Sequence, residues 1–402
     1  MHRLSLAAAL GGLLLTGAPA ILAAQEAPSP GVTLGPGGIV FRGADSAYRL
    51  TLRFRVQSTL VATSEPDETT LRDLEWTVRR ARLHLSGTVA DPRLAVLLQL
   101  GLARRDQDQD TWGFPVIVRD AFATWRWSRH FRTGFGVTKL PGNRQRVNSS
   151  ADLVFPERSI VNNTFTLDRD FGLQAYLFDT LGTVPVHVTT ALSSGRGRGA
   201  TAAKSAALTG RLEVLPLGGF LRGNDYVEGG FQREPRPRVA LGLTAQRAWN
   251  TNRTGVSLGS PLFGADEADV TTVLADGLLK WDRFTLSYEY AHRSGAPVLS
   301  TDSASGRQRF VTVGDGLLLQ STVLLARNVD LAVRAAWVWP GDAVDGLVGA
   351  GRQRQFAVAL TRYLRGHRVK VQTELGRLLV EASGGVDPGA LWIARLSTEV
   401  GL

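Results

Sequence analysis

Residues 48–57 read Tyr-Arg-Leu-Thr-Leu-Arg-Phe-Arg-Val-Gln and alternate apolar with polar side chains at every position. Successive side chains of a β-strand point to opposite faces, so a period of two predicts a strand with one apolar and one polar face. The polar face of this strand carries Arg49, Arg53 and Arg55. The stretch therefore predicts a strand with an apolar side and a strongly basic side.

The same alternation recurs along the chain, for example at 284–290 and 329–339. We count about sixteen such segments of roughly ten residues. They lie near positions 48, 76, 94, 116, 131, 171, 184, 205, 238, 269, 284, 308, 329, 353, 368 and 390. Tight connections such as 327–328 alternate with long polar ones such as 340–351. The pattern predicts an all-β fold, a transmembrane antiparallel β-barrel of about 16 strands.

Two further features favour a membrane barrel over a soluble β-sandwich or β-solenoid, which would also show a period of two. Tryptophans such as Trp281 and Trp392 lie near the ends of predicted strands, where amphipathic rings favour the membrane interfaces. The chain also ends on a predicted strand with an apolar last residue, Leu402, although such substrates of the barrel-assembly machinery more often end with Phe.

The N-terminus predicts export. Residues 1–24 combine a short basic start, an apolar core and small residues, which is typical of a secretory signal peptide cleaved after Ala24 or after Ala20. We expect residues 25–47 to form an N-terminal periplasmic segment and residues 48–402 to form the barrel. The 402-residue chain has no cysteine, which excludes disulfides and thiolate metal sites. We therefore expect a protein of the Gram-negative outer membrane that uses no metal and no cofactor.

Strand parity and the formal charge of +10 predict a basic lumen. A charge that faces lipid at mid-bilayer costs about 2 to 4 kcal/mol, so a face that carries many arginines is expected to face water. Arg79 has the opposite parity and is expected at a rim or a bulge. The lumen-facing candidates by parity are Arg49, Arg53, Arg55, Arg80, Arg82, Arg126, Arg211, Lys280, Arg334 and Lys370.

An ordered set of motifs adds a family resemblance. The motifs are Arg79-Arg80-Ala-Arg-Leu-His-Leu-Ser-Gly87, Asp120-Ala-Phe122, Gly134-Phe-Gly-Val-Thr-Lys-Leu-Pro-Gly142, Asn148-Ser-Ser-Ala-Asp-Leu-Val-Phe-Pro-Glu-Arg-Ser159 and Asp168-Arg-Asp-Phe-Gly-Leu-Gln174. With them the chain resembles the phosphate-selective porin O and P family over essentially its whole mature length. The resemblance implies a 16-stranded homotrimeric outer-membrane barrel. It also implies that residues 140–168, between the fifth and sixth strands, form an inward-folded constriction loop.

The resemblance also implies roles for particular residues. It pairs Arg79 with Arg80 in an arginine-lined path, and it places Arg146 about where relatives have a phosphate-binding lysine. The change from lysine to arginine at that place leaves phosphate selectivity open. The constriction-loop candidates are Lys139, Arg144, Arg146, Ser149, Ser150 and Arg158. A guanidinium stays charged and offers a planar fork that matches phosphate or carboxylate oxygens, so arginine suits an anion path.

These observations predict a porin that passes small inorganic anions, with phosphate as a candidate, by passive diffusion. The alternatives are a non-selective or organic-solute general porin, in which the basic residues are mostly paired, and a plugged barrel with a structural or adhesive role. We expect no enzyme, because the histidines are scattered along the chain and the family resemblance implies no catalytic role for them. The expected partners are outer-membrane lipid and lipopolysaccharide, the barrel-assembly machinery and two further copies of the chain. Nucleic acid is not expected for an exported chain, despite a pI near 10.5.

Overall fold

The structure is a computed structural model, and it describes residues 30–402 except 36, 46, 66–70, 110–114, 200–203 and 387. The predicted signal peptide, with both candidate cleavage sites, lies outside the described residues. So do the first five residues of the predicted periplasmic segment.

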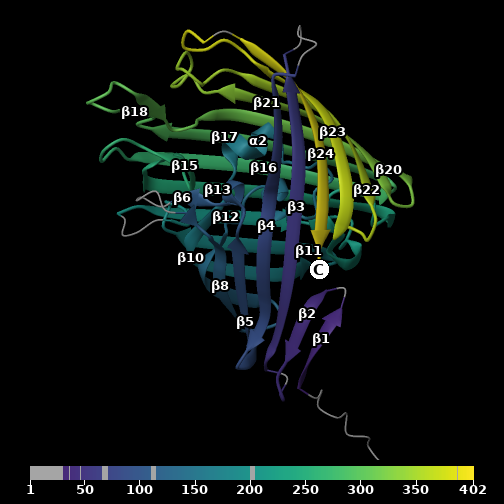
Figure 1. The fold of residues 1–402 in the computed structure, drawn as a ribbon. Helices are drawn as coiled ribbons and strands as arrows, with labels where there is room; N and C mark the ends of the chain where they lie inside the picture. The colour runs from purple at the N-terminus through teal and green to yellow at the C-terminus, as the bar shows by residue number, and fades with distance from the viewer. Residues whose placement is uncertain are drawn as a thin grey trace, which may run out of the picture.

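Within the described residues, sixteen antiparallel strands form a closed ring (Figure 1). The last strand closes the ring by pairing with the first, from Trp392 opposite Ser64 to Gly401 opposite Arg55. The ring consists of β3 (Arg49–Ser64), β4 (Asp73–Val89), β5 (Asp91–Gly101), β8 (Val118–Arg126), β9 (Phe131–Lys139), β10 (Arg169–Leu181), β11 (Val184–Ser193), β12 (Ala206–Val214), β13 (Glu234–Thr251), β16 (Ala268–Asp282), β17 (Phe284–Ala296), β20 (Gly314–Ala326), β21 (Val329–Pro340), β22 (Gln353–Tyr363), β23 (Val369–Val380) and β24 (Gly389–Gly401). The predicted fold class is therefore confirmed.

The connections divide the barrel into a short-turn end and a long-loop end. Turns such as 182–183 and 327–328 lie at the short-turn end, and by the rule for such barrels this end faces the periplasm. The long loops contain three small strand pairs, β6 (Asp108–Gln109) with β7 (Pro115–Val116), β14 (Arg253–Gly255) with β15 (Leu258–Pro261), and β18 (Leu299–Thr301) with β19 (Gln308–Phe310). The twelfth barrel strand thus begins at Gly314, and the alternation near position 308 belongs to a loop hairpin.

Each barrel strand has an exposed apolar face and a buried, more polar face. In β17, Leu286, Tyr288 and Tyr290 are each about two-fifths exposed on the outside, whereas Glu289 and Arg293 are almost fully buried on the inside. An outer surface of this kind suits lipid, because burying apolar area in the bilayer is favourable while the polar groups remain inside. Among the described residues, no helix has the length and apolar composition needed to cross a membrane.

Tryptophan side chains lie at the ends of strands on the outer surface. Trp76 and Trp392 lie near the long-loop end of β4 and β24, and Trp281 lies near the short-turn end of β16. All three are exposed, at 75%, 38% and 57%. This placement matches the aromatic girdles that flank the apolar band of membrane barrels.

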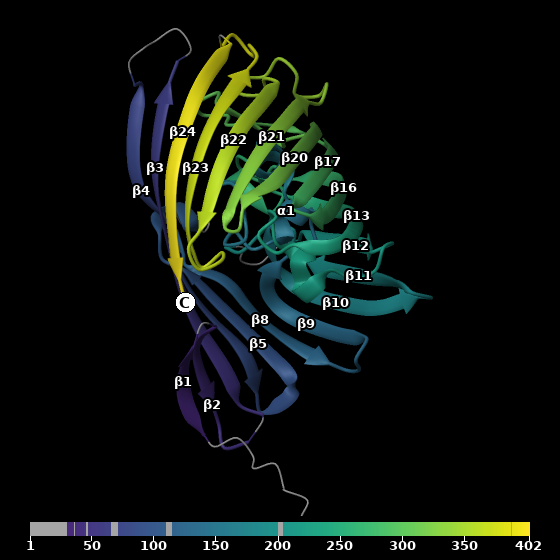
Figure 2. The same ribbon diagram turned by 90° about the vertical axis from the view of Figure 1, so that its right-hand side faces the viewer.

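An N-terminal hairpin extends the wall beyond the ring. Its strands β1 (Gly31–Gly35) and β2 (Gly38–Arg42) pair with each other, and β2 pairs with the first residues of β3, from Ile39 opposite Leu52 to Arg42 opposite Arg49. Figures 1 and 2 both show the hairpin projecting from the short-turn end. The period-two pattern did not predict these two strands.

Residues 140–168, here called the inner segment, connect β9 to β10 through the interior of the barrel. The segment contains α1 (Arg144–Val147) and α2 (Ile160–Phe165), and α2 packs against β17, β20 and β21. Gly316 of β20 makes room for α2, because a Cβ at this position would lie 2.9 Å from atoms of Val161 and Phe165. The buried apolar cluster between α2 and these strands fixes the inner segment inside the barrel.

Candidate functional site

The inner segment is attached to one half of the barrel wall, from β12 to β23. Arg144 donates to Glu213 of β12 at 2.7 Å and to Asp276 of β16 at 3.1 Å. Gln372 of β23 donates to the carbonyl oxygen of Val154 at 2.9 Å. These groups are almost fully buried, so the hydrogen bonds replace the water that the charges would otherwise bind. The other side of the segment faces β3 to β9, where it contacts β3 and β4 through Ser150, Pro156 and Glu157 and leaves an open space.

A cavity of about 640 Å³, here called the basic cavity, occupies this open space. Its basic lining residues are Arg53, Arg55, Arg79, Arg80, Arg82, Arg105, Arg119, Lys139, Arg146, Arg158, Arg169, Arg198 and Arg368. Its acidic lining residues are Asp106, Asp120, Asp152, Asp168 and Glu399. The lining also includes Arg368 and Leu402 from the short-turn end, and Arg198 and Leu258 from the long-loop end. One cavity with a marked excess of positive charge thus contacts both ends of the barrel.

Two β-bulges bring additional arginines into this cavity. On β4, Arg80 pairs with Gln57 and Val78 pairs with Ser58, so Arg79 is an extra residue in the ladder. On β8, Asp120 pairs with Gln99 and Val118 pairs with Leu100, so Arg119 is the extra residue. A bulge allows two consecutive side chains to point to the same side of a sheet. The bulge on β4 explains why the Arg79 side chain faces the interior although its parity predicts the outside. This agrees with the expectation that Arg79 lies at a rim or a bulge.

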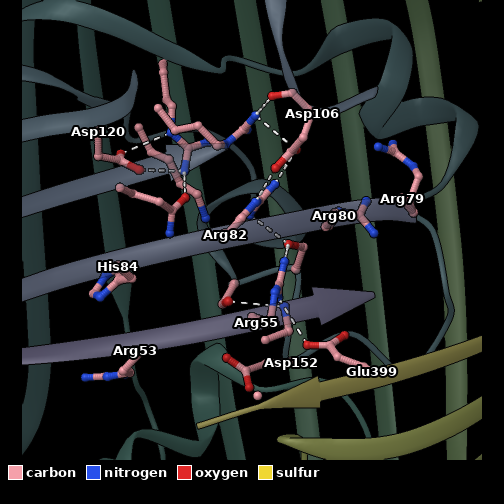
Figure 3. Close-up of a pocket in the computed structure, with 18 of the residues that line it drawn as sticks. Arg53, Arg55, Arg79, Arg80, Arg82, His84, Asp106, Asp120, Asp152 and Glu399 are labelled. Carbon is pink, nitrogen blue, oxygen red and sulfur yellow. Dashed lines mark hydrogen bonds and ion pairs between the residues drawn. The ribbon is translucent and has the colours of Figure 1, made fainter. Parts of the chain in front are cut away.

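Carboxylates from two connections hold the arginines of β4 in place. Glu157 of the inner segment accepts hydrogen bonds from Arg79 at 2.6 Å and from Arg80 at 2.8 Å. Arg82 donates through two nitrogens to Asp106, and Arg119 is 3.0 Å from the same carboxylate (Figure 3). Burial opposes ionisation of Glu157, but the charges and hydrogen bonds of the two arginines lower its pKa to about 2. Both carboxylates are therefore ionised at neutral pH.

Ser150 of the inner segment connects arginines of two strands. Its hydroxyl oxygen accepts from Arg55 at 2.7 Å and from Arg82 at 3.1 Å. Arg55 also lies 3.3 Å from Glu399 of β24. By contrast, Figure 3 shows Arg53 without a partner at the same cavity, and in the part of the chain that the structure describes no carboxylate lies within ion-pair distance of it. Arg53 is thus a cation of the cavity lining that is available to a passing anion.

The structure brings ten of the predicted site residues together in the basic cavity. They are Arg53, Arg55, Arg79, Arg80, Arg82, Lys139, Arg146, Ser149, Ser150 and Arg158. Arg49 and Arg126 lie exposed at the short-turn end, outside the lining of this cavity.

The remaining candidates are buried and attach segments of the interior to the wall. Arg144 and Arg211 share Glu213 and Asp276, and Arg211 also donates to the carbonyl oxygen of Gly142 at 3.0 Å. Arg334 donates to the carbonyl oxygen of Glu157 at 3.0 Å, and Lys370 donates to that of Leu153 at 2.7 Å. Lys280 donates to the connection between β12 and β13.

Several cavity residues were not predicted. Arg119 was missed because it lies in a bulge, and Arg105 and Arg198 were missed because they lie in loops that carry no periodicity. Arg169 was quoted only as part of a motif, yet it is buried and donates to Asp120 through two nitrogens, each at 3.0 Å. The Asp168-Arg169-Asp170 sequence at the entry to β10 was the one signal that could have identified it.

The fold and the cavity define a class of protein. A closed barrel with an apolar outer face, aromatic girdles and a polar cavity that contacts both ends is an outer-membrane channel. The family model described as phosphate-selective porin O and P matches residues 50–291, and the chain belongs to this family. It is accordingly a channel for small solutes in the Gram-negative outer membrane. No curated protein sequence matches the chain significantly.

Solved structures of outer-membrane proteins resemble the chain in fold. The anion-selective porin from Comamonas acidovorans is 12% identical with a TM-score of 0.53, over 88% of this chain and 99% of that one. The outer-membrane channel DcaP of Acinetobacter baumannii is 12% identical with a TM-score of 0.54, over 88% and 97% of the two chains. OmpF of Salmonella typhi, in a complex with daunomycin, is 13% identical with a TM-score of 0.53, over 89% and 98%. At these identities the likeness concerns the fold alone.

Proposed function

We propose that this channel passes small inorganic anions by diffusion, and that phosphate is among them. The observation that carries the proposal is the lining of the basic cavity, where thirteen basic side chains face five carboxylates. Such a lining raises the local concentration of anions and lowers that of cations. Because the inner segment narrows the interior, the charges lie close to a passing ion, inside the screening length of about 8 Å at physiological salt. The resemblance in fold to an anion-selective porin accords with this direction of selectivity.

The proposed path uses the arginines in sequence. An anion that enters from the short-turn end meets Arg53 and Arg368, and one that enters from the long-loop end meets Arg105 and Arg198. Between them lie Arg55 and Arg82, which share the Ser150 hydroxyl oxygen. A phosphate or chloride ion can take the place of that oxygen as acceptor, because guanidinium groups bind oxyanions through paired N–H donors. Several weak sites in a row allow binding without trapping.

A second candidate is a general porin without ion preference. It is favoured by the pairing of the innermost cations, since Arg80, Arg82 and Arg169 each have a carboxylate partner at 3.0 Å or less. Paired charges produce a weaker field along the path. The alternative of a plugged structural barrel predicts no conductance, and the basic cavity of about 640 Å³ speaks against it. Catalysis has no role in any of these proposals.

We also propose that the channel works as a homotrimer, is inserted by the barrel-assembly machinery and contacts lipopolysaccharide through its basic long loops. The support for the trimer is membership in the family, and the support for the lipopolysaccharide contact is the basic character of the chain. Chemical cross-linking of the protein in native membranes tests the trimer, and a ladder that ends at two copies would contradict it.

The experiment that tests ion preference is single-channel recording in a planar bilayer under a potassium chloride gradient. The sign of the reversal potential reports which ion passes, and we expect a preference for chloride. Added phosphate is expected to reduce the chloride current, because the several acceptor oxygens of a phosphate ion bind more of the arginine N–H donors than a chloride ion does. A reversal potential with the sign expected for a cation-selective channel would contradict the proposal. A value near zero without block would support the general porin.

A further inference from the structure

The connection between β12 and β13, residues 215–233, departs from the other connections at the short-turn end. It is long, contains the 3-10 helix η2 (Leu221–Tyr226) and lies against buried side chains of the barrel interior. The other connections at this end have one to five residues, for example two at 182–183 and at 327–328. Here it is called the second inner segment.

The wall of the barrel holds this segment by buried hydrogen bonds. Lys280 of β16, 2% exposed, donates to the Asn224 side chain at 2.8 Å and to the carbonyl oxygens of Val227 and Gly229 at 2.7 and 3.0 Å. The N–H of Gly230 donates to Asp330 of β21 at 3.0 Å. A buried ammonium with three acceptors is satisfied only while the segment stays in place.

The glycines of the segment permit this close approach. Gly229 has a φ of +82°, and a Cβ there would lie 2.4 Å from a carboxylate oxygen of Asp330. A Cβ on Gly230 would lie 2.8 Å from the carbonyl oxygen of Arg283. Both positions therefore require the absence of a side chain. The two glycines therefore allow residues 228–230 to lie in close contact with the inside of the wall.

Glu228 joins the two inner segments to the wall. Its carboxylate accepts from Gln145 at 3.3 Å and from the N–H of Val154 at 3.1 Å, both in the inner segment, and from Gln320 of β20 at 3.1 Å. Its own N–H donates to the carbonyl oxygen of Asp152 at 2.9 Å. One residue thus connects the β12–β22 side of the barrel with both ends of the stretch from Gln145 to Val154.

We propose that the second inner segment determines the ion preference of the channel by closing the β12–β22 side of the lumen, and that Glu228 is its positioning residue. The inference rests on the proposed function. None of residues 215–233 lines the basic cavity, which runs along β3 to β9. With the second inner segment in place, a solute has to pass the arginine-rich wall. With it displaced, a solute can pass beside less basic strands.

The test records single channels of the full-length protein carrying Glu228→Gln. Loss of a carboxylate from the lumen would, by charge alone, increase the preference for anions. If Glu228→Gln displaces the second inner segment, we expect the opposite change, a lower anion-to-cation permeability ratio. We also expect the conductance to rise by about twofold or more, because the open cross-section grows. The matched control is Glu381→Gln in the loop between β23 and β24, which removes the same charge outside both inner segments and is expected to leave both quantities unchanged.

The double variant Gly229→Ala/Gly230→Ala displaces the segment without a charge change and is expected to act in the same direction. Heat-modifiable migration in gels verifies that each variant barrel is folded. Unchanged conductance in folded variants, a larger conductance with the wild-type ion preference, or a higher anion preference in Glu228→Gln would overturn the proposal. The proposed function is tested separately by the wild-type channel. If the wild type shows no anion preference, the proposed function fails, whatever the variants show.

Discussion

At the scale of single residues, Arg53 offers the cleanest measurement of the basic cavity, because it lines the path without an ion-pair partner among the described residues. We expect Arg53→Gln to fold like the wild type and to lower the chloride preference in bilayer recordings. The effect is expected to be larger at 0.1 M than at 1 M salt, where the Debye length falls from about 10 Å to about 3 Å.

The control for that change is Arg126→Gln. Arg126 was predicted from parity to face the same lumen, but it lies exposed at the end of β8 and outside the cavity lining. The two substitutions remove the same charge from the same half of the barrel. An equal shift of the reversal potential in both variants would contradict a local role for the basic cavity.

Glu157 links pH to the same path. Its pKa of about 2, against 4.5 ordinarily, means that its ion pairs with Arg79 and Arg80 are complete above about pH 4.5 and are lost as the pH falls through 2. At pH 7 we expect Glu157→Gln to have a stronger anion preference than the wild type, because two arginines lose a neutralising charge. Recordings at pH 7, 5, 3 and 2 should show the wild type approaching the variant only below about pH 3. A constant difference at every pH would contradict this assignment.

Sequence periodicity predicted site residues on regular strands and failed where the backbone departs from regularity. Arg55, Arg80 and Arg82 follow directly from parity. Arg119 does not, because its inward direction depends on a bulge that is set by pairing with β5 rather than by local sequence. Arg79 was recovered through the family resemblance and not through its spacing.

At the scale of elements, the inner segment depends on the buried network around Arg144. This guanidinium binds Glu213 and Asp276, and removing one partner of a buried ion pair leaves charges without compensation. We expect Arg144→Met to destabilise the folded barrel by about 3 to 5 kcal/mol, measured by urea unfolding in detergent. The variant channel should also show larger current fluctuations, since the segment is less firmly held.

The matched control is Arg247→Met, which removes an arginine paired with Asp269 on the exposed side of β13 and β16. Both partners are about two-fifths exposed, and such surface pairs contribute about 1 kcal/mol or less. If the two variants lost similar stability, the network around Arg144 would not be what holds the inner segment.

The sequence showed where the inner segment begins and ends, because β9 and β10 on either side alternate clearly. It did not show the second inner segment. Residues 215–233 have no periodicity, and their position depends on Lys280, Asp330 and Gln320, each on a strand far along the chain. Contacts of this kind between distant strands cannot be inferred from local spacing. The expectation of short turns at one end therefore did not reveal that one connection at this end is long and folds inward.

At the scale of the whole molecule, closure of the ring does not involve the N-terminal hairpin. The last strand pairs with β3 from Arg55 to Ser64, whereas β2 pairs only with residues 49–52 of the same strand. The hairpin therefore continues the wall where β24 has ended, and it contributes none of the sixteen strands of the ring. Its outer strand β1 is mostly exposed, including Val32 and Leu34.

Because the ring closes without the hairpin, we expect deletion of residues 31–42 to leave a folded, conducting barrel. The backbone pairing between all neighbouring strands of the ring remains without the hairpin, and the partners that are lost are those of residues 49–52, beyond the end of β24. We expect the deletion protein to keep heat-modifiable migration and to keep the sign of its reversal potential, because Gly37 is the only residue of 31–42, within the described part, that lines the basic cavity. As a comparison, deletion of 397–402 removes half of the closing pairs between β24 and β3 and should abolish the folded band. A hairpin deletion that also failed to fold would assign the hairpin to assembly of the barrel itself.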